Sequence, residues 1–202
     1  MTFDDANDDG IIELSEIVVA NGVLNSPGDT AVYAGSPTPT REFSLSQTVG
    51  LFKGALRIQG LLDYKGGFKQ YNLTEVFRCT ATGNNCRGIH DPSASLEDQA
   101  RAVARRLHPR ASNWGYLEDG EFLKLREVSV TYSLPNRFAG MFGAQHASLT
   151  LGGRNLATWT GYTGVDPEVN GAGQAAFNGF GVQDFLTQPQ VRTFLLRANF
   201  TF

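Results

Sequence analysis

The chain has 202 residues, of which 17 are Lys or Arg and 20 are Asp or Glu, so its formal net charge is −3. This balance gives no basic surface of the kind that binds nucleic acid, and we expect no nucleic-acid partner. Charged residues make up only 18%, whereas 23 residues are Gly and 14 are Phe. That composition favours an all-β protein over a helical bundle or a disordered chain. No segment approaches the ~18 apolar residues of a membrane-spanning helix, but a transmembrane β-barrel remains possible because alternating strands average out in hydropathy.

An acidic loop near the start of the chain matches the calcium-binding pattern D-x-[DN]-x-[DN]-G-x5-E in full. Oxygens at its first, third and fifth positions can converge on one ion because a glycine at the sixth lets the chain turn sharply. The Ca²⁺ ligands expected from this pattern are Asp5, Asn7, Asp9, Ile11 through its carbonyl, Glu13 and Glu16. The flanking sequence indicates no helices, so the alternative is a solvated acidic loop that binds nothing tightly.

Five segments alternate apolar and polar residues with the period of a β-strand, namely 41–51, 54–64, 121–134, 146–156 and 190–202. The short junction between the first two predicts a hairpin. In the third, Lys124 and Arg126 share parity with the apolar residues that follow, so its first half is less regular. Strands of this length exceed the usual ~5–6 residues and suit a tilted crossing of a bilayer, which needs ~9–11. We therefore predict antiparallel strands of a transmembrane barrel with a polar interior.

Two connections, 66–120 and 159–189, are long and polar, and the others are short. This asymmetry is typical of outer-membrane barrels with long extracellular loops. One helix is predicted over 93–107, with Ser95 as N-cap and Asp98 at its third position. Four aromatic residues of these connections could stack on a sugar or peptide ligand, or simply pack within the loops or at the lipid interface: Trp114, Tyr116, Trp159 and Tyr162.

The two cysteines, Cys79 and Cys86, flank a Gly-Asn-Asn turn. A disulfide between them would imply an oxidising compartment, and two unlinked thiols are the alternative. No catalytic motif is present, so we do not expect an enzyme. Residues 171–176 resemble a dinucleotide-binding fingerprint, but no strand–helix–strand unit surrounds them.

The C-terminal segment places apolar residues at alternate positions and ends on an aromatic residue. The residues are Phe194, Leu196, Phe200 and Phe202. In an outer-membrane barrel these side chains would face lipid and its interfacial aromatic girdle. The alternative is a core strand that happens to be last in the chain.

An ordered series of segments resembles the late barrel of SusC/RagA-type TonB-linked outer-membrane proteins, the TonB-dependent receptors. The segments are 5–16, 35–39, 61–67, 122–135, 153–156, 161–168 and the terminal Phe202. They cover nearly the whole chain and occur in the order of the family.

The resemblance implies that residues 1–202 are the C-terminal part of such a receptor, with the last five or six strands of a barrel of about 22. It implies that a signal peptide, a plug domain and a TonB-contacting segment lie N-terminal to this chain. The implied role is uptake of oligosaccharides, peptides or similar nutrients across the bacterial outer membrane. The implied partners are membrane lipid, the TonB complex and a SusD-like surface lipoprotein. The competing hypothesis is a soluble, secreted, calcium-binding β-sandwich that binds carbohydrate.

Overall fold

The structure is a computed structural model that describes residues 1–19, 33–80, 85–109, 112–169 and 183–202. The fingerprint-like residues 171–176 lie outside these ranges. The chain divides into two compact units, which are described separately. Unit 1 comprises residues 1–38, 68–120 and 162–188, and unit 2 comprises residues 39–67, 121–161 and 189–202.

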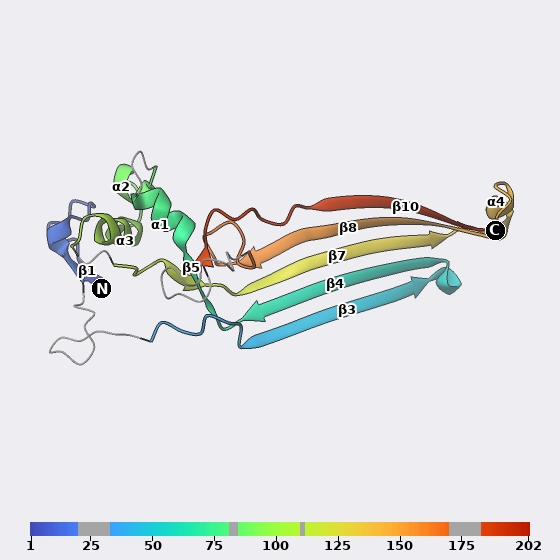
Figure 1. Cartoon of the computed structure of the whole chain (residues 1–202), viewed down its shortest axis with the longest axis horizontal. Coiled ribbons are helices and arrows are strands. Elements are labelled where there is room, and N and C mark those ends of the chain that lie inside the picture. The colour runs from blue at the N-terminus through green and yellow to red at the C-terminus, as the bar shows by residue number, and fades with distance from the viewer. Residues whose placement is uncertain (20–32, 81–84, 110–111, 170–182) are drawn as a thin grey trace. The chain divides into compact units, whose positions relative to one another are not determined.

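Unit 2 contains a five-stranded antiparallel sheet in the order β10-β8-β7-β4-β3 (Figure 1). Its strands are β3 (Arg41–Leu51), β4 (Leu56–Gly66), β7 (Phe122–Ser133), β8 (His146–Thr160) and β10 (Thr193–Thr201). The predicted all-β class with antiparallel strands is confirmed. The largest difference in bounds is at β8, which continues to Thr160, so that Trp159 lies in a strand and not in a long loop.

One face of this sheet is apolar across all five strands, because the register aligns the apolar parity of each strand with that of its neighbour. One such row runs through Val49, Ile58, Val130, Leu151 and Leu196. The face is open to its surroundings: Leu151 is 59% exposed and Leu196 is 70% exposed. The C-terminal aromatic residues Phe194, Phe200 and Phe202 are exposed as well.

A β-sandwich would bury such a face between two sheets. The described residues of unit 2 form one sheet, with no second sheet packed on it. The structure therefore does not support the soluble β-sandwich hypothesis.

The opposite face is polar and is crossed by ion pairs and hydroxyl contacts. Arg126 donates to Asp63 at 2.6 Å, and Arg154 donates to Glu127 at 3.1 Å. Arg126 occupies a β-bulge, where the register shifts between Leu125 and Glu127. The extra residue switches the parity of β7, which explains why Lys124 and Arg126 disturb the alternation in the sequence.

The strands are joined by short turns at one end. The 3₁₀ turn η2 (Phe52–Gly54) connects β3 to β4, and α4 (Asn136–Gly140) lies between β7 and β8. Phe52 and Lys53 both have positive φ, as a tight hairpin requires to match the strand twist. At the other end the chain leaves each strand for a long segment that belongs to unit 1.

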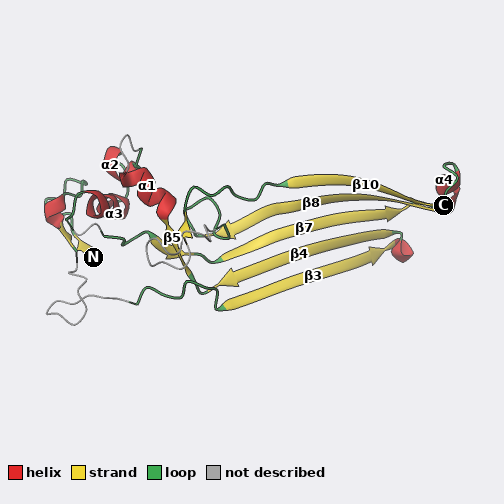
Figure 2. Cartoon of the chain, in the orientation of Figure 1, coloured by secondary structure: helices red, strands yellow, loops and turns green. Residues whose placement is uncertain are grey.

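Unit 1 is mixed, and its elements are distinguished by colour in Figure 2. Its strands are β1 (Thr2–Phe3), β2 (Ile17–Val18), β5 (Lys69–Asn72), β6 (Leu117–Asp119) and β9 (Gln183–Asp184), and its helices are α1 (Leu73–Thr80), α2 (Arg87–His90) and α3 (Leu96–Arg106). The 3₁₀ turn η1 spans Leu14–Glu16. The predicted helix corresponds to α3, and Ser95 caps it by accepting from the Asp98 amide. Two further helices were not predicted.

Small residues allow the helices of unit 1 to pack closely. Ala100 and Ala104 of α3 are fully buried against Ile12 and Ile17. A Cβ atom at Gly88 of α2 would clash with the Asp98 carbonyl oxygen of α3. None of the helices in the described ranges is both long and apolar enough to cross a membrane.

We predict that Gly88→Ala destabilises unit 1 by about 1–3 kcal/mol, because the new methyl group meets backbone that cannot rotate away. Hydrogen exchange of the α2 and α3 amides should become faster. Gly140→Ala in α4 is the matched control, since its Cβ would meet nothing within 4 Å. Equal exchange rates in the Gly88 variant and the unmodified protein would contradict this packing.

Candidate functional site

The acidic loop of unit 1 is stabilised by its own carboxylates, which accept hydrogen bonds from backbone amides. Asp5 Oδ2 accepts from the Gly10 amide at 2.9 Å, and Asp9 Oδ1 accepts from the Ile11 amide at 2.8 Å. Glu16 accepts from the Ala6 amide through Oε1, at 2.9 Å. Gly10 has φ +78°, a conformation that favours glycine at the sixth position of the loop.

Hydrogen bonds orient the candidate ligands of the acidic loop, but the ligand atoms do not converge on one point. Among the described residues, only Glu75, Cys79 and Cys86 bring three His, Cys, Asp or Glu ligand atoms within 4.8 Å of one another. Asp5, Asp9 and Glu16 therefore do not form a closed carboxylate cage in this conformation. The residue types and their spacing still fit Ca²⁺, which takes six to eight oxygen ligands in flexible geometry.

Gln99 of α3 attaches the acidic loop to the rest of unit 1. Its Oε1 accepts from the Ile12 amide at 2.9 Å, and its Nε2 donates to the Gly10 carbonyl at 3.0 Å. Gln99 is only 3% exposed. Sequence patterns could not find this contact, because the partners are 87 and 89 residues apart.

The cysteine pair forms a disulfide, with Sγ atoms 2.09 Å apart, that joins the end of α1 to the start of α2. Glu75 Oε1 lies 3.5 Å from Cys79 Sγ. Because both sulfur atoms are bonded to each other, the cluster of Glu75, Cys79 and Cys86 offers no thiolate to a metal.

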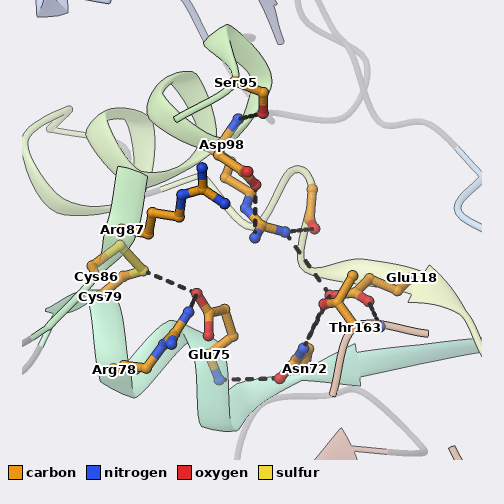
Figure 3. A network of polar contacts seen from close by, with 12 residues as sticks. Asn72, Glu75, Arg78, Cys79, Cys86, Arg87, Ser95, Asp98, Glu118 and Thr163 are labelled. Carbon is orange, nitrogen blue, oxygen red and sulfur yellow. Dashed lines mark hydrogen bonds and ion pairs between the residues drawn. A yellow bond between two sulfur atoms is a disulfide. The ribbon is translucent and has the colours of Figure 1, made fainter. Parts of the chain in front are cut away.

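A polar network holds the middle of unit 1 together (Figure 3). Asn72, at the end of β5, accepts from the Glu75 amide through Oδ1 and donates to Glu118 Oε1, each at 3.0 Å. Glu118 of β6 also accepts from the backbone amide and the hydroxyl of Thr163, at 2.8 Å each. These bonds connect three segments that are distant in the sequence.

Beside this network lies a cavity of about 280 Å³, which we call the α1 cavity. It is lined by Asn72, Thr74, Glu75, Arg78, Thr163, Gly164, Val165 and Asp184. Arg78 donates to Glu75 at 2.6 Å, and this hydrogen bond raises the pKa of the Arg78 guanidinium. The cavity combines charged, hydroxyl and apolar side chains, as small-molecule sites do.

The four aromatic residues predicted to stack on a ligand have different environments. Tyr116 is 0% exposed and Tyr162 is 6% exposed, so both rings are part of the core, as the loop-packing alternative expects, and do not form a stacking surface. Trp114 is half-buried and packs edge-on against Phe3. Trp159 is 54% exposed on the apolar face of β8, opposite Leu123.

Burial governs the ionisation of the two buried tyrosines. It raises the pKa of Tyr116 to about 12. Burial raises the pKa of Tyr162 further, and so does the Asp184 carboxylate, which accepts a hydrogen bond from its hydroxyl at 3.1 Å. Sequence analysis missed Asp184 and its partner Thr74, which are 110 residues apart and form no local motif.

We predict opposite effects from removing the two neighbouring tyrosine hydroxyls. The Tyr116 hydroxyl is buried without a hydrogen-bond partner in the described structure, so Tyr116→Phe should keep or raise the free energy of unfolding of unit 1, by up to about 1 kcal/mol. Tyr71→Phe loses the bond to Asn113 and should lower it by about 1 kcal/mol. Resistance to proteolysis in urea measures both. Equal losses would contradict the assignment.

Comparison with known proteins finds relatives that carry one common description. No protein-family model matches the chain. "TonB-dependent receptor P3" of Formosa agariphila is 38% identical over 90 residues, which are 43% of this chain and 9% of that protein. "TonB-dependent receptor P26" of the same organism is 28% identical over 197 residues, which are 90% of this chain and 19% of that protein. The chain thus spans less than a fifth of the length of either relative.

A solved structure of the RagAB peptide importer in the "open-open" state shares the fold. It has a TM-score of 0.56 and 23% identity, over 83% of this chain and 18% of that chain. The sequence matches and the shared fold confirm the resemblance found in the sequence. The chain therefore resembles part of TonB-dependent receptors in its sequence, and it shares its fold with the RagAB peptide importer.

Proposed function

We propose that this chain supplies C-terminal strands of a β-barrel that imports nutrients across the bacterial outer membrane. The observation that carries the proposal is the exposed apolar face of the five-stranded sheet. An uncovered apolar face of this extent would be costly in water and is stabilised when it faces lipid. The polar face, with its ion pairs and hydroxyl contacts, then lines the interior.

The spacing of the aromatic side chains supports this orientation. Phe43, Tyr64, Leu123 and Trp159 form one row across the sheet, and Leu51, Leu56, Tyr132 and Leu149 form another. On β4 the rows are eight residues apart, or ~26 Å along the strand. At a tilt of ~40° this is ~20 Å across a bilayer, close to the ~25 Å apolar band of outer-membrane barrels.

Unit 1 would then contribute to the ligand vestibule on the extracellular side, because its segments connect the strands at the end opposite the short turns. The nutrient would be an oligosaccharide, a peptide or a similar molecule. The fold shared with the RagAB peptide importer favours a peptide as the nutrient. The proposed activity is transport without catalysis.

The proposal includes two protein partners of the whole receptor. A segment N-terminal to this chain would contact the TonB complex, which supplies the energy. A SusD-like surface lipoprotein would assist ligand capture outside. Both follow from the relatedness to TonB-dependent receptors and from the shared fold with RagAB.

We predict that Val128→Arg lowers the amount of folded protein in the outer membrane, because it places a charge near the middle of the apolar face at a cost of about 2–4 kcal/mol. Ser129→Arg is the matched control, one residue further along β7 and on the polar face. Membrane fractionation and heat-modifiable gel mobility measure the folded fraction. Folding of the unmodified protein as a monomer in detergent-free buffer would contradict the barrel.

We also propose that the acidic loop binds Ca²⁺, on the strength of the complete 12-residue pattern and of its attachment to α3 through Gln99. Asp5, Asn7, Asp9 and Glu16 would supply side-chain oxygens, with Glu13 as a further carboxylate and Ile11 contributing its carbonyl. The ion would replace hydrogen bonds from backbone amides, and so draw the carboxylates together. Its role would be to stiffen unit 1.

We predict that Ca²⁺ protects the segment 5–16 from proteolysis, and that Asp9→Ala abolishes the protection because it removes a ligand. Asp4→Ala is the control: it removes one negative charge just outside the pattern, and the amide of residue 4 still bonds to the Glu16 carbonyl. Mass spectrometry of the cleavage products, with Mg²⁺ in place of Ca²⁺ for comparison, measures the effect. The same cleavage rate with and without Ca²⁺ would contradict the Ca²⁺ site and favour the alternative, a solvated acidic loop that binds nothing tightly.

A further inference from the structure

Asp184 in the wall of the α1 cavity is a buried carboxylate with an unusual set of partners. The residue is 2% exposed. It accepts hydrogen bonds from three hydroxyls: from Thr74 at 2.7 Å and Thr187 at 3.3 Å through Oδ1, and from Tyr162 at 3.1 Å through Oδ2. No lysine, arginine or histidine of the described chain forms an ion pair with it. A carboxylate has about four acceptor positions, so one remains.

Among the residues that the structure describes, Arg78 is the one cationic residue in the cavity lining, and its charge is already paired, as is that of Arg101 elsewhere in unit 1. Arg78 pairs with Glu75 at 2.6 Å, and Arg101 pairs with Asp98 at 2.9 Å. The lining residues therefore carry one positive charge, on Arg78, and two negative charges, on Glu75 and Asp184. Since buried charges are normally paired, the negative charge of Asp184 is uncompensated, and a cation bound beside it would be stabilised.

Exposed apolar side chains occur in the cavity lining and in the segment that follows Asp184. Val165 lines the cavity and is 62% exposed, and Leu186 is 73% exposed. Leu186 also has φ +51°, a costly conformation for a branched residue. Its amide donates to the Thr74 hydroxyl at 2.8 Å, the same hydroxyl that donates to Asp184. The backbone of Leu186 is thus bonded to a residue of the cavity wall, two positions after the buried anion in the chain.

A single buried carboxylate near apolar side chains favours an organic cation over an inorganic ion. An inorganic ion would require several converging carboxylates, and the described residues form no such group at Asp184. An organic cation needs one carboxylate for its N–H groups and an apolar surface for its carbon skeleton. The N-terminus of α1 offers some compensation to Asp184 through the Thr74 hydroxyl, but a partial charge of about one half does not neutralise a carboxylate.

We propose that the α1 cavity binds a protonated amine carried on an apolar body, with Asp184 as its anionic partner and with Val165 and Leu186 against its carbon skeleton. The inference goes beyond import and does not depend on it, because it concerns equilibrium binding to unit 1. The ammonium group would take the fourth acceptor position of Asp184. The Glu75–Arg78 pair would remain intact.

The test is calorimetric titration of the whole receptor, purified in detergent, with leucine amide. This probe carries an ammonium group and an apolar side chain and has no carboxylate. N-acetyl-leucine amide, which is neutral but otherwise similar, is the control probe and should not bind. N-acetyl-lysine amide carries its ammonium group on a side chain, so its binding relative to leucine amide distinguishes a side-chain amine from a chain terminus.

Three variants locate the site. Asp184→Asn should weaken binding of leucine amide by at least about tenfold, because a hydrogen bond to a charged group is lost. Leu186→Gly should weaken it several-fold, and it should not unfold unit 1, since glycine accepts the positive φ without strain. Asp119→Asn removes an exposed charge of the same unit, which pairs with Lys69, and should leave binding unchanged.

Absence of millimolar or tighter binding of leucine amide to the folded protein would overturn the proposal. Equal binding by the unmodified protein and by folded Asp184→Asn would also overturn it. If Asp184→Asn does not fold, the Leu186→Gly variant provides the test instead, and unchanged binding of leucine amide by that variant would overturn the proposal. Failure of nutrient uptake in cells with intact calorimetric binding would instead contradict the proposed transport function alone.

Discussion

The rest of the structure depends on one constraint, the period of two in strands that are paired over almost their whole length. Each strand of unit 2 sends alternate residues to opposite faces, and the antiparallel register keeps these faces consistent from β3 to β10. The apolar face needs a non-aqueous surrounding, and in such a surrounding every backbone amide needs a partner. The outer edges of β3 and β10 must then pair with further strands, so the proposed membrane location requires a larger barrel.

The β-bulge at Arg126 shows how this constraint accommodates a charge. Without the extra residue, Arg126 would share the apolar face with Val128 and Val130. The bulge turns it to the polar face, where it bonds to Asp63 at 2.6 Å. A local irregularity therefore preserves the separation of faces along β7 and adds a partly buried ion pair between adjacent strands.

Elements governed by local periodicity could be predicted, and those governed by distant contacts could not. The five long strands and α3, with its Ser95 cap, follow from patterns within about a dozen residues. The helices α1 and α2 were missed because they are short, with eight and four residues, and are fixed by the disulfide and by packing on α3. The acidic loop is a local motif, whereas its attachment to Gln99 and the assembly of Asp184, Thr74 and Tyr162 join residues distant in the sequence. For Tyr116 and Tyr162 the sequence left ligand stacking and packing within the loops open, because the residue type suits both and burial is a property of the fold.

The two acidic features of unit 1 differ in how their charge is compensated, and this difference matters more than the number of carboxylates. The acidic loop has many carboxylates, but its residues 5–10 are mostly exposed, and water and backbone amides screen their charge. A hydrated ion can enter there and leave again, so binding depends on how well the loop closes. Asp184 is a single carboxylate, yet it is buried and surrounded by hydroxyl groups that supply no positive charge. A low-dielectric environment strengthens its interaction with any cation that reaches the cavity, and in the proposed site the apolar side chain of Val165 adds selectivity. On physical grounds the less conspicuous acidic residue is the stronger determinant of what this unit binds.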